Sequence, residues 1–342
     1  ALLINGYTPT YAAGIAILAV IAASWLTRKP MGPIVVAEAM ALGSRNMIMT
    51  AVLLCSIGLI VNVIAMSGVG NTFSLMITQW AGDSLLIAIV LVALASLVLG
   101  MGLPVTAAYI VLGTLSAPAL FDLIANQQLA TAIASGDVGE QAKTMLMLVS
   151  PEAAAKLGTP MPLDAAKEIV AAIPRELMAP IREGIIDATS LTFALLSAHL
   201  IIFWLSQDSN VTPPVCLTAF TAAAIAKTPA MATGVTSWKI AKALYIVPLL
   251  FAYTPFIGGP LPEVFTIFGF ALVGLYAFSG FMQGHLEKPM SWPIRIALLA
   301  CGVTLLLPLA TYIKLVGLAG FVAILVLNIR SKSVVQAATA SS

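Results

Sequence analysis

A short polar stretch interrupts an apolar part of the sequence between residues 206 and 212. Six of its seven side chains are polar, two prolines follow, and apolar runs lie on both sides. A proline ends a helix and frees carbonyl groups, which can bind a cation together with side-chain oxygens, while the free amides of the next helix favour an anion. The alternative is a solvated loop in which a polar side chain caps a helix. The candidate ligands in this stretch are Asp208, Ser209, Asn210 and Thr212, with Asp208 first because ionisable groups inside spans commonly mark ion pathways.

A second interruption divides the apolar run 84–121 near its middle. Gly100, Gly102 and Pro104 fall at this point, and Thr106 follows them. Two glycines and a proline lower helix stability and remove an amide donor, so carbonyl groups are left without partners inside the helix. Such carbonyls and the hydroxyl of Thr106 can ligate Na⁺. The alternative is a tight turn outside the membrane that joins two ordinary helices.

The sequence carries no signature of an enzyme. It contains no GxxxxGK[ST], HExxH or GxSxG motif, and its two histidines, His199 and His285, are far apart. An intramembrane aspartic protease would need a second carboxylate at the depth of Asp208, and the nearest candidates lie at the ends of apolar segments. We expect His199 to be an interhelical hydrogen bonder and Lys227 to extend towards a membrane surface. No catalytic residue is therefore predicted.

The elements that hold these residues must lie in lipid. Of the 342 residues, 60% are hydrophobic and 9% are charged, which excludes a soluble globular protein. A net charge of +2 without a basic stripe excludes a nucleic-acid partner. We expect apolar segments at 8–27, 46–66, 84–100, 104–121, 190–206, 211–227, 240–258, 263–283, 293–310 and 312–329, not all of which need cross the bilayer.

The stretch from Asp122 to Asp187 differs from the rest of the chain. It holds nine of the 14 acidic residues and five of the 16 basic ones, a local balance of −4. Ala-rich helical patterns and several prolines mark it as a helical insertion outside the membrane. Basic residues near other span ends favour the cytoplasm, which places the insertion on the opposite side.

Three ordered motifs resemble one known family. Thr8-Pro9 followed by Ala12-Ala13, the run Gly100-Met101-Gly102-Leu103-Pro104, and Thr212-Pro213-Pro214 are similar to motifs of the large membrane subunit of tripartite ATP-independent periplasmic (TRAP) transporters, in the form fused to the small subunit. The chain resembles the C-terminal portion of such a permease. The resemblance implies that the small-subunit helices and a first repeat precede Ala1.

This resemblance implies an all-α polytopic protein of the bacterial inner membrane, an elevator-type transporter repeat with a re-entrant hairpin and broken helices. It implies Na⁺-coupled transport of a small organic anion, delivered by a periplasmic binding protein. The hairpin would run from Arg45 to Thr72 with its tip near Cys55–Gly58, after an arm helix at Met31–Ser44. The implied divisions are 1–44 (scaffold span and arm helix), 45–121 (hairpin and broken helix), 122–188 (insertion), 189–239 (second broken helix and hairpin-like segment), 240–330 (additional spans) and 331–342 (polar tail).

We therefore expect one site near the bilayer midplane that binds Na⁺ and the anion. The predicted Na⁺ ligands are Gly100, Gly102, Thr106, Asp208, Asn210 and Thr212, and the predicted substrate contacts are Thr106, Ser209, Asn210 and Thr212. Expected partners are the binding protein, the rest of the permease, the organic anion and membrane lipid. Two alternatives stay open: a Na⁺/carboxylate symporter that works without a binding protein, and a structural or assembly subunit that transports nothing.

Overall fold

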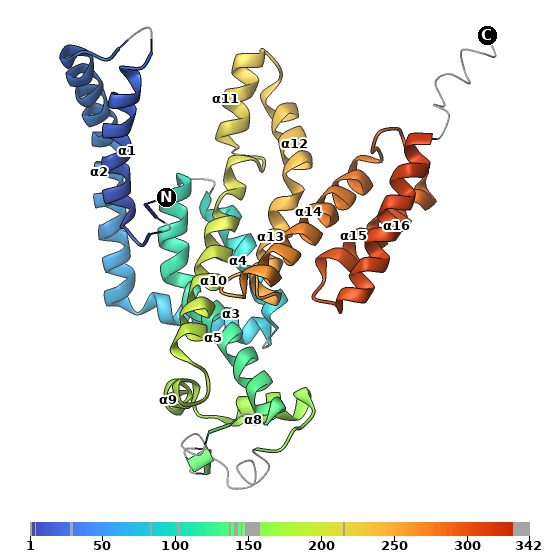
Figure 1. The fold of residues 1–342 in the computed structure, drawn as a ribbon. Helices are drawn as coiled ribbons and strands as arrows, with labels where there is room; N and C mark the ends of the chain where they lie inside the picture. The colour runs from blue at the N-terminus through green and yellow to red at the C-terminus, as the bar shows by residue number, and fades with distance from the viewer. Residues whose placement is uncertain are drawn as a thin grey trace. The chain divides into compact units, whose positions relative to one another are not determined.

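A computed structural model describes residues 2–3, 5–27, 30–82, 84–100, 103–136, 138–139, 143–144, 146–147, 158–214 and 216–330 of the chain (Figure 1). Within these residues the regular structure is helical, apart from one isolated bridge between His285 and Pro289. The chain divides into two compact units, residues 1–60 and residues 61–342.

The first unit contains α1 (Pro9–Ser24) and most of α2 (Pro33–Ser67). The Thr8 side chain caps α1 by accepting a hydrogen bond from the amide of Tyr11, and Pro9 occupies the first turn, where a missing amide hydrogen costs nothing. Apolar side chains such as Leu18 are exposed along α1, as expected of a surface that faces lipid.

The hairpin expected between Arg45 and Thr72 is not formed in the structure. One continuous helix, α2, passes through Cys55–Gly58, and the chain turns instead at Gly68, where φ is +69°. A single glycine costs a helix only about 1 kcal/mol relative to alanine, and α2 has no proline after its first residue. The expected arm helix at Met31–Ser44 is accordingly the first part of α2.

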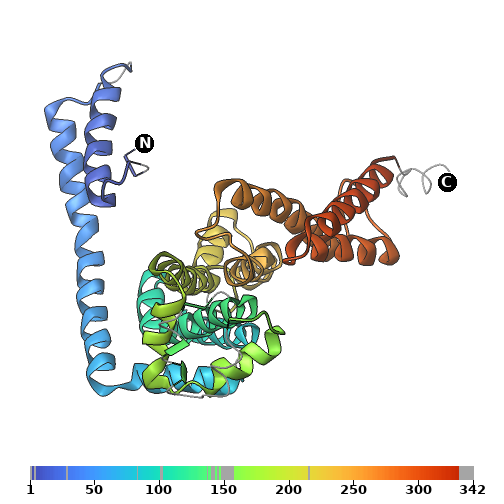
Figure 2. The same cartoon turned by 60° about the horizontal axis from the view of Figure 1, so that its bottom comes forward.

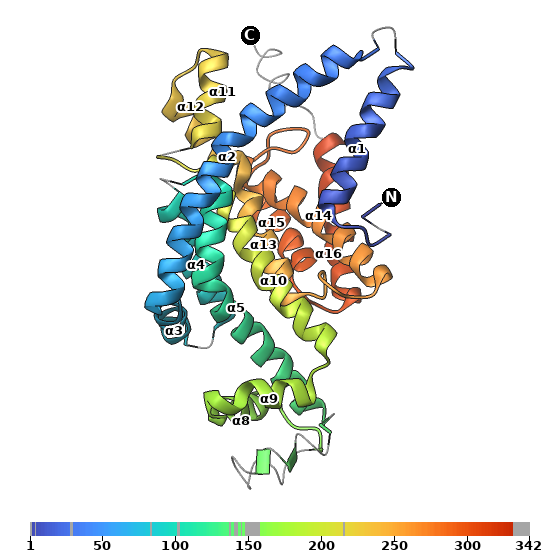
Figure 3. The same ribbon diagram turned by 90° about the vertical axis from the view of Figure 1, so that its left-hand side faces the viewer.

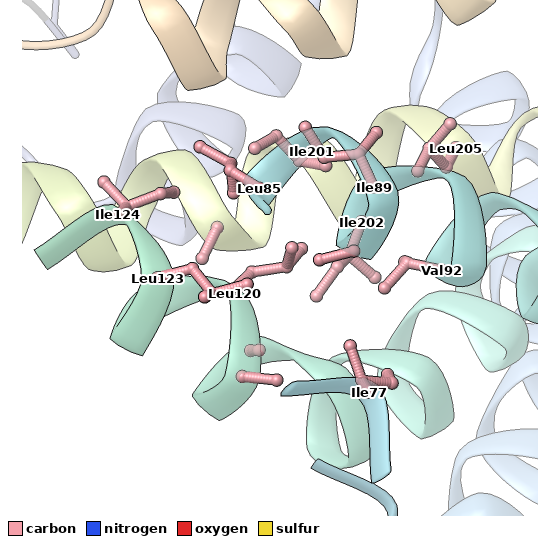
Figure 4. Close-up of a cluster of buried hydrophobic side chains, with 14 of the residues drawn as sticks. Ile77, Leu85, Ile89, Val92, Leu120, Leu123, Ile124, Ile201, Ile202 and Leu205 are labelled. Carbon is pink, nitrogen blue, oxygen red and sulfur yellow. The ribbon is translucent and has the colours of Figure 1, made fainter. Parts of the chain in front are cut away.

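The second unit is built around five packed helices, α3 (Val69–Ala81), α4 (Leu85–Gly100), α5 (Val105–Ser135), α10 (Ala188–Ser206) and α13 (Val247–Tyr253). Figure 4 shows the shared core, in which Val92, Leu120, Ile201 and Ile202 are fully buried. Lipid tails are as apolar as leucine, so close packing rather than escape from water stabilises these contacts. The core fixes where α4 and α10 end.

The insertion has a core of its own. Helices α8 (Leu163–Ala172) and α9 (Arg175–Ile185) pack against the last turns of α5 (Figure 3). Helix α5 runs through Asp122 without a break and ends at Ser135, so the expected start of the insertion at 122 lies within this helix and stays a prediction. Charge composition marks where a helix leaves lipid and not where it ends.

Arg182 fastens α9 to α5. Its side chain is 7% exposed, and its guanidinium donates to Asp122 Oδ1 at 2.7 Å and to Asn126 Oδ1 at 2.7 and 3.2 Å. The three charge-assisted bonds join residues about 60 positions apart in the sequence. They hold the insertion on the helix that leads to the first interruption.

We expect Arg182→Ala to loosen the insertion. The change leaves the Asn126 amide without its donors and costs about 2 kcal/mol of stability, since Asp122 is half exposed and can be hydrated. Hydrogen exchange should increase in α8 and α9 while α4 and α10 stay protected. Arg175→Ala, at an exposed position on the same helix, is the matched control. Unchanged protection in Arg182→Ala would show that the three bonds do not hold α9.

The chain ends in a bundle of α14 (Leu261–Gln283), α15 (Trp292–Leu306) and α16 (Thr311–Arg330), the orange-to-red helices of Figure 2. Ala277 and Leu298 are fully buried between these helices and Phe321 is nearly so. The buried residues of this bundle form a smaller hydrophobic core, separate from the core around α5 and α10.

Five described helices are long and apolar enough to cross a membrane, and a bent pair adds a sixth. The pair is α12 (Ala230–Ile240) with α13, which meet at a 48° bend. All ten expected apolar segments are at least partly helical, while the segment at 211–227 yields only the 10-residue α11 (Leu217–Ala226). The five spans are Pro33–Ser67, Val105–Ser135, Ala188–Asn210, Leu261–Gln283 and Thr311–Arg330, so the chain is an all-α polytopic membrane protein, as the sequence predicts.

Candidate functional site

Both expected interruptions fall at helix ends in the structure. Helix α4 ends at Gly100 and α5 begins at Val105 after Pro104. Helix α10 ends at Ser206, a short 3₁₀ turn η1 (Asp208–Asn210) follows, and α11 begins at Leu217. The peptide bond between Pro213 and Pro214 is cis. Gly102, a predicted Na⁺ ligand, lies outside the described residues.

The two interruptions meet in space. Gly100 and Ser209 are both buried, and a Cβ atom added at Gly100 would overlap the Ser209 side chain and lie 3.5 Å from Ser209 Cα. Only a residue without a side chain lets η1 approach the end of α4 so closely. The structure therefore brings the predicted residues Gly100, Asp208 and Ser209 together from two distant parts of the chain.

Asp208 is the charged group at this meeting point. Its side chain belongs to a residue that is 3% exposed, and its Oδ1 accepts hydrogen bonds from the hydroxyls of Thr212 and Tyr245. The hydroxyls of Thr212 and Tyr245 are also 3.1 Å apart. Among the described residues, the side chains that contact the Asp208 carboxylate are these two neutral hydroxyls, so none of them supplies a compensating positive charge.

Tyr245 is a residue of the candidate site that sequence reasoning missed. It lies in η2 (Ala241–Tyr245), at the bend between α12 and α13, so a third irregular segment meets the first two. The contact joins residues 37 positions apart. A lone tyrosine in an apolar segment has no local pattern that assigns its partner, so the sequence offers no signal for it.

Asn210 and Thr106 are placed less centrally. Asn210 is half-buried, and its Oδ1 accepts a hydrogen bond of 3.3 Å from Thr218 at the start of α11. Thr106 is exposed in the first turn of α5, and no contact among the described residues links its hydroxyl to Asp208. Both residues lie on segments that adjoin the meeting point, and neither side chain contacts Asp208 in the described structure.

Ser96 adds a further oxygen on α4. The residue is fully buried, and its hydroxyl has no hydrogen-bond partner among the described residues. It precedes Gly100 by four positions, so the two residues share one face of the helix. A buried hydroxyl without a partner is rare in proteins and is common where a ligand completes the site.

The oxygens gathered here suit a hard monovalent cation. The site offers the Asp208 carboxylate, the hydroxyls of Thr212, Tyr245 and Ser209, and main-chain carbonyls freed at the helix ends. The described residues hold no cluster of three or more His, Cys, Asp or Glu side chains that could bind a metal ion, which argues against a transition-metal centre within them. Among the described residues at the meeting point, Asp208 is the one with an ionisable side chain, so an anion would need a cation or a helix N-terminus beside it.

His199 makes the expected interhelical contact, while the expected extension of Lys227 towards a membrane surface stays a prediction. The Nδ1 atom of His199 lies 3.3 Å from the hydroxyl of Tyr109, which joins α10 to α5. Lys227 ends α11 in the left-handed conformation, with φ at 54°, and is exposed. Neither contacts the carboxylate of Asp208 in the described structure.

One family model matches the chain: "Tripartite ATP-independent periplasmic transporter, DctM component", over residues 1–257. The matched part includes α1 to α13 and both interruptions, while α14 to α16 lie beyond it. No curated protein and no solved structure gives a significant match. The family is a membrane permease of the bacterial inner membrane and not an enzyme family. Because the match covers three quarters of the chain, the protein belongs to the DctM component, the large membrane subunit, of the TRAP transporters.

Proposed function

We propose that this permease moves a small organic anion across the bacterial inner membrane together with Na⁺, and that a periplasmic binding protein delivers the anion. The observation that supports the proposal most is the buried carboxylate of Asp208 at the point where two helix breaks meet. Discontinuous helices of secondary transporters bind ions and substrates at such breaks, with carbonyl oxygens at the cation and helix N-termini at the anion.

The residues divide by chemistry. Asp208 and Thr212 supply a carboxylate and a hydroxyl to Na⁺, and the predicted ligands Gly100, Gly102, Thr106 and Asn210 complete its shell. Ser209 and the side chains of Asn210, Thr212 and Thr106 contact the substrate. A bound Na⁺ neutralises Asp208 and so permits a carboxylate to approach, which couples the two solutes.

The elevator mechanism is part of the same proposal. In it the segments 45–121 and 189–239 carry the site across the membrane, residues 1–44 belong to the fixed scaffold, and 240–330 supply additional spans. The insertion at 122–188 then stays in water and moves with α5. Cross-linking that traps α4 or α10 at two different depths would test this arrangement.

Replacing Thr212 by valine tests the proposed site. Valine keeps the shape of threonine but removes the hydroxyl that contacts Asp208, so we expect Na⁺-stimulated uptake to fall at least about tenfold, with normal expression. The measurement is Na⁺-driven uptake by the complete permease with its binding protein in proteoliposomes. Thr114→Val is the matched control, because the Thr114 hydroxyl donates only to the carbonyl of Ile110 in its own helix. Normal uptake by Thr212→Val would count against the site.

One structural feature favours an assembly role as a second candidate function. The insertion has its own buried core, so it can present a stable surface to a partner without help from the ion site. Deleting residues 138–185 and measuring binding-protein affinity and Na⁺ binding separately distinguishes the roles: loss of docking with intact Na⁺ binding assigns docking to the insertion. Uptake that persists without any binding protein would instead indicate an independent symporter.

A further inference from the structure

An open cavity lies far from the helix breaks. Its volume is about 660 Å³, and it is lined by α5, the start of α10, residues 185–187 and the loop that follows α13. Ser197 in its wall precedes the end of α10 by nine residues, or about 14 Å along the helix, and its first residue on α5, Ile124, is about 29 Å from the start of that helix. The cavity is therefore separate from the site around Asp208.

Two buried polar groups in its wall lack partners. Ser197 is 6% exposed and its hydroxyl makes no hydrogen bond to any described residue. The Oε1 atom of Gln128 is also unpartnered within the described structure and is covered by protein, so the Gln128 side chain must turn for this oxygen to reach a ligand in the cavity. Unpaired buried polar groups destabilise a fold, and a ligand that bonds to both removes this penalty.

The wall selects against anions. Asp187 is the only charged residue among those that line the cavity. Its carboxylate accepts hydrogen bonds from the Ser190 hydroxyl at 2.6 Å and the Ser190 amide at 2.9 Å, and these bonds hold the pKa of Asp187 below its ordinary value. The carboxylate is therefore ionised at neutral pH and repels a second negative charge. The charge of Asp187 therefore disfavours an anionic ligand in this cavity.

The remaining wall is a mixture of amides, hydroxyls and aromatic rings. Gln127 and Gln128 carry amides, which can donate and accept hydrogen bonds. The hydroxyls of Thr131 and Ser135 donate to the carbonyls of Gln127 and Ala132 at 2.9 Å, so they are left as acceptors. The rings of Phe193 and Phe251 supply flat apolar faces in the same cavity. A ligand with hydroxyl groups on a short carbon skeleton matches such a wall, because each hydroxyl can donate and accept a hydrogen bond. The volume of the cavity lies within the range of small-molecule sites.

We propose that this cavity binds a neutral, hydroxyl-rich molecule of polyol or monosaccharide size, either as a free solute or as the headgroup of a glycolipid. Ser197 and Gln128 bond to its hydroxyls, and Phe193 and Phe251 flank its carbon atoms. Binding at this site does not require Na⁺ or the transported anion, so it can be tested independently of the proposed transport function.

Binding of tritiated mannitol to the full chain tests the free-solute form. The chain is purified into nanodiscs of phosphatidylethanolamine and phosphatidylglycerol, without Na⁺ and without any organic anion. We expect saturable binding that unlabelled mannitol displaces and succinate does not. Ser197→Ala and Gln128→Leu should each weaken binding about tenfold. Ser116→Ala removes an equally buried and unpartnered hydroxyl from α5 outside this cavity and should change nothing.

A second set of nanodiscs, containing glucosyl diacylglycerol, tests the lipid source. Retention of this lipid by the wild-type chain in native mass spectrometry, and its loss in Gln128→Leu, assigns the cavity to a headgroup; mannitol binding alone assigns it to a free solute. The proposal is overturned if neither probe binds saturably, if both variants bind like the wild type, or if succinate displaces mannitol. If Ser197→Ala does not fold, the binding measurement with Gln128→Leu still tests the proposal.

Discussion

Asp208→Asn is expected to abolish Na⁺-driven uptake while the permease still reaches the membrane. The amide keeps an acceptor oxygen for the hydroxyls of Thr212 and Tyr245, so the local fold is retained, but the only charge at the meeting point is lost. A carboxylate about 4 Å from a cation contributes about 4 kcal/mol at an effective dielectric constant near 20. Na⁺ affinity should therefore fall by up to about 1,000-fold.

The measurement separates binding from transport. Na⁺-dependent thermal stabilisation of the purified permease reports binding without substrate, and uptake in proteoliposomes reports transport. Asp164→Asn removes an exposed carboxylate from α8 and should leave both unchanged. Wild-type Na⁺ stabilisation in Asp208→Asn would contradict the assignment of the carboxylate to the ion.

Gly100→Val should separate the two helix breaks and stop transport. The new Cβ would overlap the side chain of Ser209 and crowd its Cα, so η1 must move away from α4. Overpacking of this kind costs about 1–3 kcal/mol, and the displacement also moves Asp208 relative to the carbonyls at the end of α4. We expect uptake to fall at least about 100-fold, because ion ligands must be positioned within a fraction of an ångström.

Gly269→Val is the matched control for this change. Gly269 lies in α14, and a Cβ added there meets nothing within 4 Å in the described structure. Transport by this variant should be normal. If Gly100→Val also transports normally, α4 and η1 do not act together, and the site must be sought at one break alone.

Both breaks could be predicted from the sequence because glycine and proline act locally. Gly100 with Pro104, and Pro213 with Pro214, remove helix hydrogen bonds at their own positions, so their effect does not depend on the rest of the fold. The hairpin tip near Cys55–Gly58 that the family resemblance implies is absent from the structure, because a single glycine is too weak to end α2.

The partners of the buried polar groups could not be predicted in this way. Tyr245 reaches Asp208 across 37 residues, and Arg182 reaches Asp122 across 60. Such pairs depend on how helices pack, and hydrophobic periodicity specifies which face is buried but not which neighbour covers it. The sequence therefore predicted Asp208 as a candidate ligand but could not predict which side chains surround it.

One helix links the ion site to the water-exposed part of the chain. Helix α5 begins beside the first break and ends in the core of the insertion, a length of about 46 Å at 1.5 Å per residue. Pro118 is the only interior proline along it. If the proposed function holds, a protein that docks on the insertion and an ion bound at Asp208 act on opposite ends of this one helix, so docking and ion occupancy can influence each other through it.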